Sequence, residues 1–303
     1  MYIKMMKSLI ILILLLPIHA MADSFSISLE NDIINSTDQA YTHGTKFSKL
    51  KNDVPSCLDS IFPDRATYIN YIYAQYMYTS TDISVETLME NDRPYGGWLY
   101  CGYSFSAYTP TRLDSFEIDL GVTGEWSGAE QVQKTVHDIF NNREPKGWDN
   151  QLGEEVGIDL IWQEKLKFRM SKYFDIIPHY GTALGTIHTF FNVGGMLRAG
   201  YNLPDDYGPL MSEPVNRELS DWYVYAFTAV DGRYVARNFF LDGNLFKDSH
   251  SVPKEAFVTD LVSGVSLSFN DFEIVYAYTI RSKEHKWQED HNEFGSLILS
   301  WKY

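Results

Sequence analysis

Alternation of apolar and polar residues recurs along almost the whole chain, and it limits the folds that the chain can adopt. In Phe116–Val122, for example, apolar residues alternate with Glu117, Asp119 and Gly121. A period of two places successive side chains on opposite faces of a β-strand, so each run predicts a strand with one apolar face. The sequence therefore predicts an all-β fold. The same alternation appears in residues 24–29, 99–107, 156–163 and 272–281.

The length and spacing of these runs favour a membrane barrel over a soluble β-sandwich. Each run has about ten residues, which is what a tilted strand needs to cross a bilayer. The pair Asn270-Asp271 predicts a tight turn between two runs, and the last run, Leu297–Tyr303, ends on an aromatic residue. Aromatic residues make up 15% of the chain, as in the girdles of membrane barrels. We predict a transmembrane antiparallel β-barrel of about twelve strands, because even strand numbers are the rule.

The N-terminus has the pattern of a secretory signal. Lys4 and Lys7 precede an apolar run, Leu9–Leu16, and Ala20-Met21-Ala22 follows as a cleavage site. The apolar run is shorter than the ~20 residues that span a bilayer, although a membrane anchor is the alternative. We therefore expect a signal peptide at 1–22 and one barrel domain at 23–303, in the outer membrane of a Gram-negative cell.

The net charge limits the possible binding partners, and the cysteine content limits the possible disulfides. The formal net charge of −15 argues against nucleic acid and would suit divalent cations, although a solvated acidic surface explains it equally. Export would permit a disulfide between Cys57 and Cys101, but nothing in the sequence brings the two together. We expect a monomer surrounded by outer-membrane lipids.

One segment, 128–141, interrupts the strand rhythm and predicts a helix. Ser127 can cap its N-terminus, with Glu130 three residues further on. Backbone that faces lipid must be strand in a barrel, so this helix is expected in a loop or a plug. Its apolar stripe comprises Val132, Val136, Ile139 and Phe140.

Three polar segments are candidates for chemistry. On the helix, Glu130, Gln133 and His137 share one face, and histidine is the usual general base near neutral pH. Glu30-Asn31-Asp32 ends the first run with oxygen ligands that suit calcium. Asn91–Trp98 carries Arg93, whose planar guanidinium binds phosphate or carboxylate. Taken singly, each segment has an ordinary structural explanation, namely a surface histidine, a turn and a Pro-Gly loop.

The sequence lacks a nucleophile-elbow serine motif, a zinc-protease H-E-x-x-H motif and a P-loop. A histidine base with a metal ion is another route to ester hydrolysis, because the histidine deprotonates water and the cation stabilises the oxyanion.

Taken together in this order, four motifs resemble the outer-membrane lipid A 3-O-deacylases. They are Ser28–Asp32, Tyr41–Gly44, Asp92–Trp98 and the segment from Val132 to Gln151. The resemblance covers the N-terminal half, with only barrel rhythm in the C-terminal half. It implies a twelve-stranded barrel with its site at the outer-leaflet end beside a loop helix. It also implies calcium-dependent removal of the 3-linked acyloxyacyl group from the lipid A of lipopolysaccharide.

The resemblance also implies residue roles. His137 is the general base, Asp32 the calcium ligand and Asn31 its neighbour, although alternation places Asn31 and Asp32 on opposite faces unless the strand ends or bulges there. Gly96 stands where alanine is commoner in the family, which puts no catalytic residue in doubt. Other site residues that the resemblance implies are Gln133 and Thr42 as site-lining groups, Gly44 as a backbone N–H near the oxyanion, and Glu144 as an acidic metal-site residue. Because lipid A is anionic, Arg93 and Lys134 are candidates to contact its phosphates, although a solvated surface role is the alternative for Lys134.

Two other functions fit the same pattern. A porin or structural barrel would need no histidine-bearing loop helix, so residues 128–141 speak against it. A barrel phospholipase would be marked by a serine nucleophile with a paired histidine, and no motif in the sequence marks one.

Overall fold

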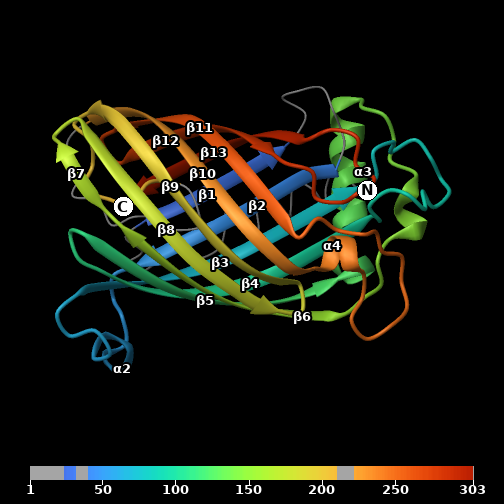
Figure 1. Cartoon of the computed structure of the whole chain (residues 1–303), viewed down its shortest axis with the longest axis horizontal. Coiled ribbons are helices and arrows are strands. Elements are labelled where there is room, and N and C mark those ends of the chain that lie inside the picture. Colours follow the sequence, from blue (N-terminus) through green and yellow to red (C-terminus); the bar gives the residue numbers. More distant parts are fainter. Residues whose placement is uncertain (1–23, 32–39, 210–221, 303) are drawn as a thin grey trace.

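Antiparallel strands wind around a closed barrel, with α3, α4 and the long loops gathered at one end and α2 at the other (Figure 1). The computed structural model describes residues 24–31, 40–209 and 222–302, without the side chains of residues 40–42 and 140. The strands are β1 (Ser24–Asn31), β2 (Ala40–Lys51), β3 (Ala66–Thr79), β4 (Gly96–Tyr108), β5 (Arg112–Thr123), β6 (Val156–Leu166), β7 (Phe168–Ser171), β8 (Phe174–Gly185), β9 (His188–Tyr201), β10 (Trp222–Asn238), β11 (Phe257–Phe269), β12 (Phe272–Arg281) and β13 (Asn292–Lys302). The helical segments are α2 (Ser56–Asp59), η2 (Gly124–Ser127), α3 (Ala129–Phe140), η3 (Gly147–Asn150) and α4 (Phe239–Asp242).

Sheet pairing closes the barrel. Apart from β6 and β7, each strand pairs with its neighbours in the chain, and β1 pairs with the last strand, β13, in an antiparallel register. Strands β6 and β7 are separated by Lys167 alone and both pair with β8, so they form one interrupted strand. The described strands thus form a twelve-stranded barrel without open edges, as predicted.

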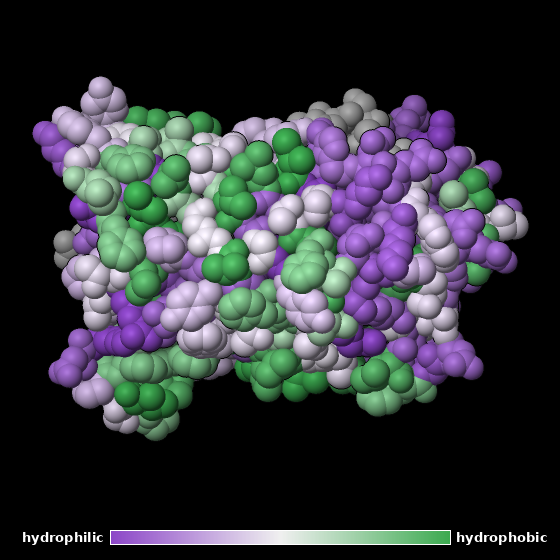
Figure 2. Space-filling model, viewed as in Figure 1, coloured by the Kyte–Doolittle hydropathy of each residue, from purple (hydrophilic) through white to green (hydrophobic). Residues whose placement is uncertain are grey.

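The alternation in the sequence separates an apolar outer face from a polar inner face. On β5, Ile118 and Leu120 are exposed, whereas Asp119 between them is buried in the barrel. In Figure 2, hydrophobic side chains cover much of the strand region and hydrophilic ones gather at the loop end. A band of apolar residues around a polar lumen is the pattern of a membrane barrel.

The two ends of the barrel differ in loop length. Short turns such as 109–111 and 270–271 join strands at the end that carries α2 and β7. Asn270 adopts φ 52°, which bears out the predicted tight turn. The opposite end carries the segments 80–95, 124–155 and 239–256, with α3 and α4. Longer loops belong to the extracellular side of such barrels, so α3 lies at the outer-leaflet end.

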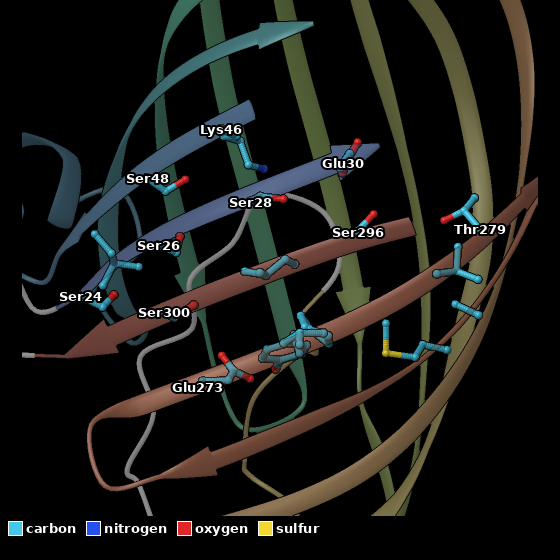
Figure 3. A pocket seen from close by; sticks show the side chains of 18 of the residues that line it. Ser24, Ser26, Ser28, Glu30, Lys46, Ser48, Glu273, Thr279, Ser296 and Ser300 are labelled. Carbon is cyan, nitrogen blue, oxygen red and sulfur yellow. The ribbon is translucent and has the colours of Figure 1, made fainter. Parts of the chain in front are cut away.

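Side chains fill much of the lumen at both ends. At the loop end, Phe239 and Phe240 of α4 are fully buried against Trp98 and Tyr100. Toward the other end lies a second cluster around Tyr223. A cavity of about 320 Å³ remains in the lumen, lined by serines of β1, β2, β11 and β13 and by charged residues (Figure 3).

No helix among the described residues is long and apolar enough to cross a membrane. Cys57 and Cys101 are both free and exposed.

Candidate active site between helix α3 and the barrel wall

The chain leaves β5 through η2 and enters α3 at Gly128, which adopts φ 67°. The start of α3 is fastened to the barrel at two points. Gln75 of β3 donates from Nε2 to the backbone oxygen of Ser127 at 2.7 Å. On β4, a Cβ at Gly97 would overlap Ser127 Oγ and Ala129 Cβ, so only glycine allows this close approach.

These contacts place the start of α3 on the outer surface of the barrel. On β3, Tyr76 lines the lumenal cavity and Tyr78 packs on Phe240 inside the barrel mouth. Gln75 and Met77 alternate with these two tyrosines and therefore face outward. Met77 packs with Ala129 of α3 in one buried cluster. In Figure 1, α3 lies across the barrel axis at the loop end.

Helix α3 buries a polar face against the protein. Gln133 and His137 are each 3% exposed, whereas the apolar residue Ile139 is 55% exposed and Val132 is also exposed. A loop helix in water would bury its apolar stripe instead. The predicted cap also needs correction: Gly128 is the N-cap, and Ser127 Oγ accepts a hydrogen bond only from Ala129 N, at 3.3 Å.

His137 is held by the chain that follows α3. Asn141 ends the helix in a left-handed conformation with φ 55°, and the backbone then turns so that the carbonyl oxygen of Arg143 meets His137 Nδ1. A carbonyl oxygen only accepts, so Nδ1 carries the proton in the neutral ring. Nε2 is then the nitrogen with the lone pair, which is the form a general base needs.

Gln133 lies one turn before His137 on the same buried face. Its Oε1 accepts a hydrogen bond of 2.7 Å from the indole Nε1 of Trp148 in η3. Its Nε2 is buried and has no hydrogen-bond partner in the structure. Of the three residues predicted to share a face, Gln133 and His137 are both buried on it, whereas Glu130 is only partly buried and pairs with Lys134 at 2.7 Å.

Four residues form an outward-facing row across β1 to β4 beside α3. Asn31 pairs with His43, His43 pairs with Met77, and Met77 pairs with Gly97. Directly paired residues in a sheet share one face, so Asn31 and His43 lie on the same outer surface as Gly97, where α3 begins. Asn31 Nδ2 lies 3.5 Å from His43 Nδ1. His43 was absent from the predicted site.

The neighbouring predicted residues have different positions. Gly44 pairs with Glu30, which lines the lumenal cavity, so Gly44 contributes backbone on the inward row. Thr42 lies at a β-bulge, because the register of β2 with β3 shifts between Tyr41 and His43. Asp32 lies outside the described residues.

Comparison with known families shows to which barrels the chain is related. A family model described as "Outer membrane protein LpxR" matches residues 8–303, which is nearly the whole chain. The chain belongs to this family. The resemblance inferred from the sequence motifs is thereby confirmed, and the protein is an outer-membrane β-barrel.

One solved structure of this family supports the barrel fold, and other barrels show a lower similarity. LpxR from Salmonella typhimurium superposes with a TM-score of 0.79 at 16% identity, covering 92% of this chain and 100% of that one. The β-domain of the Bordetella autotransporter BrkA gives a TM-score of 0.48 at 9% identity, covering 94% and 99% of the two chains. The NanC porin gives 0.41 at 5% identity, covering 92% and 100%. No match was found among curated protein sequences.

In this LpxR-family barrel, Arg93 is not where the predicted phosphate contact requires it. It is 1% exposed, donates to Glu284 Oε2 at 2.8 Å and lies over the Tyr78 ring inside the barrel mouth. Burial alone would raise the pKa of Glu284, but Arg93 and Arg281 lower it below its usual value. Arg93 therefore has a structural role. The prediction was wrong because the loop motif does not show on which face of the barrel wall the Arg93 side chain lies.

Glu144 is exposed in the segment after α3, so the structure does not fix its carboxylate in a site. Within the described ranges, no three histidine, cysteine or acidic side chains come close enough to hold a metal ion. Calcium binding therefore stays a prediction that depends on Asp32.

Proposed function

We propose that this LpxR-family barrel is a lipid A 3-O-deacylase, which hydrolyses the 3-linked acyloxyacyl ester of lipopolysaccharide in the outer leaflet. The observation that carries the proposal is the position of His137. The imidazole is buried under α3, which is fastened to the outward face of the wall, and its Nδ1 contact leaves Nε2 as the basic nitrogen. A base at this position is beside lipid rather than in the lumen.

The surroundings of the site suit a lipid substrate. The exposed flank of α3 carries Val132 and Ile139, and Trp126 of η2, which precedes α3 in the chain, is also exposed. A helix with one polar side and one apolar flank settles at the membrane interface, where tryptophan is also enriched. Acyl chains can contact this flank while the ester reaches the polar face of Gln133 and His137. In the lumen, by contrast, the clusters around Phe240 and Tyr223 occupy much of the space, which gives no support to a porin.

The proposed reaction uses water as the nucleophile. His137 Nε2 takes a proton from water as the water oxygen bonds to the ester carbonyl carbon, and the carbonyl π electrons move onto oxygen. When this oxyanion collapses, the bond to the sugar 3-oxygen breaks, and that oxygen takes the proton from His137. The products are the free acyloxyacyl carboxylic acid and the 3-hydroxyl of lipid A.

Calcium is part of the proposal, because the donors expected near β1 are oxygen atoms. The carboxamide of Asn31 with the carboxylates of Asp32 and Glu144 would hold the ion, and such ligands match a hard cation. When bound, calcium would stabilise the negative charge that develops on the ester carbonyl oxygen. We also infer that residues 1–22 direct export and are then removed.

Mass spectrometry of lipid A tests the proposal. Cells expressing the wild-type protein are expected to contain lipid A that lacks one acyloxyacyl group, and cells expressing His137→Ala are expected to match the empty-vector control. A wild-type profile identical to the control would refute the deacylase. Loss of an acyl chain from phospholipid alone would favour a phospholipase instead.

A further inference from the structure

A buried carboxamide with unused donors lies beside His137. Gln133 is almost fully buried, and its Nε2 has no hydrogen-bond partner in the structure. Buried polar groups in proteins are nearly always hydrogen-bonded, so an unpaired pair of N–H donors needs an explanation. A substrate oxygen in the site would supply the missing acceptor.

Trp148 determines which way this carboxamide points. An indole N–H can donate but not accept, so the Gln133 atom at 2.7 Å from Trp148 Nε1 must be the oxygen. The amide nitrogen must then lie on the side away from the indole. Without this bond, a half-turn of the amide would present oxygen where a donor is needed.

The indole is itself rigidly held. Trp148 is fully buried, and its ring meets the Tyr95 ring edge-on with centroids 5.1 Å apart. A Cβ at Gly147 would overlap the same Tyr95 ring, so the chain before Trp148 lies flush against it. Leu152 N donates to Tyr95 O at 2.8 Å, which ties the segment after η3 to the same residue. Trp148 therefore has no room to follow a rotating carboxamide.

We propose that Trp148 is a positioning residue, which directs the Gln133 N–H donors toward the ester carbonyl oxygen during the reaction of His137. This inference rests on the proposed function. An oxyanion is stabilised best by donors that are already oriented before charge develops on oxygen. Gln133 would be the residue that touches the substrate, and Trp148 would act only through it.

A double-mutant cycle on purified protein, with lipid A in detergent micelles, tests this role. Trp148→Phe keeps an aromatic ring but removes the N–H, and Gln133→Met keeps a long side chain but removes the amide. We expect Gln133→Met to lower kcat by about 10²–10³, as for other oxyanion donors, and Trp148→Phe to lower it by roughly tenfold with KM unchanged. In the Gln133→Met background, Trp148→Phe is expected to have no further effect.

The controls separate positioning from packing. Trp287→Phe makes the same change at an exposed tryptophan of the β12–β13 loop and is expected to leave kcat unchanged. Heat-modifiable migration on gels reports whether each variant retains its barrel. Wild-type kcat in Trp148→Phe, or an equal loss in both backgrounds, would overturn the proposal. If wild-type protein and His137→Ala are equally inactive on lipid A, the proposed function itself fails, and the oxyanion role fails with it.

Discussion

The imidazole Nδ1 of His137 meets the backbone carbonyl oxygen of Arg143, three residues beyond the end of α3. This contact selects the tautomer through the backbone, because the end of the helix returns the chain to the histidine. Asn141 makes this return possible with its left-handed conformation, in which Asn142 N donates to His137 O at 2.9 Å. The base is thus oriented by local chain geometry, and the barrel wall supplies the other side of the site.

The close approach of Gly97 to α3 predicts a selective loss of activity. Gly97→Ala adds a Cβ that overlaps Ser127 Oγ and Ala129 Cβ, so the start of α3 must move off β4. Overpacking of this kind costs about 1–3 kcal/mol. We expect reduced deacylation with a folded barrel. Gly232→Ala is the matched control, since its Cβ would meet only Val193 O, at 3.7 Å; equal activity of both variants would contradict the fit of α3 to the wall.

Calcium removal is expected to stop hydrolysis. Asn31 and its carboxylate neighbours would lose the cation to a chelator, and the developing oxyanion would lose its main positive charge. Activity on lipid A should fall to background in excess chelator and return when calcium, but not magnesium alone, is restored in excess. Full activity in the presence of the chelator would show that calcium has no part in the mechanism. The role of His137 would still be tested separately by His137→Ala.

The apolar flank of α3 is expected to affect the turnover of lipid A only when the substrate lies in a bilayer. Ile139→Asp places a charge on the exposed flank, where contact with outer-leaflet lipid would become unfavourable by up to about 1 kcal/mol. We expect slower turnover of lipid A in vesicles but near-normal turnover in detergent micelles. Thr135→Asp, at another exposed position of α3, serves as the control. Equal loss in vesicles and micelles would show that Ile139 acts on the site and not on the membrane.

The buried charges at the barrel mouth predict a loss of stability in acid. Burial and then Arg93 lower the pKa of His285 to about 4, so the folded protein resists protonating this ring. The unfolded chain takes up that proton near pH 6.5, and stability should therefore fall as the pH drops from about 6.5 toward 4. Glu284, whose pKa is also lowered, adds a loss at lower pH as it protonates.

Thermal unfolding as a function of pH measures this effect. His285→Asn should flatten the decline in stability between pH 6.5 and 4. The further decline at lower pH, which comes from protonation of Glu284, should remain. Glu284→Gln should lower stability at neutral pH by about 3 kcal/mol, because it leaves the Arg93 charge buried without its partner. An unchanged pH profile of stability in His285→Asn would contradict the assignment of this decline to His285.

Much of the barrel was predictable because strand alternation is a local property. The runs around Ile118 and Ile274 and the turn at Asn270 needed no distant partner to be recognised. The break at Lys167, which divides one strand into β6 and β7, was not predictable, since it depends on how two neighbours pair with β8.

The site was predictable only in part. The four-residue spacing showed that Gln133 and His137 share one face of α3. It did not show that this face is the buried one, because burial depends on the barrel wall beneath α3. His43 joins Asn31 through the register of β1 with β2 and a bulge at Thr42, and neither follows from residue types. Trp148 reaches Gln133 only after the chain folds back across fifteen residues.

The initial rate of lipid A deacylation by purified wild-type protein and by His137→Ala tests the central claim most directly. General-base catalysis contributes about 10²–10⁴-fold, so the variant should lose at least a hundredfold in kcat while keeping its folded barrel. A rate for His137→Ala within a fewfold of wild type would contradict the assignment of His137 as the base.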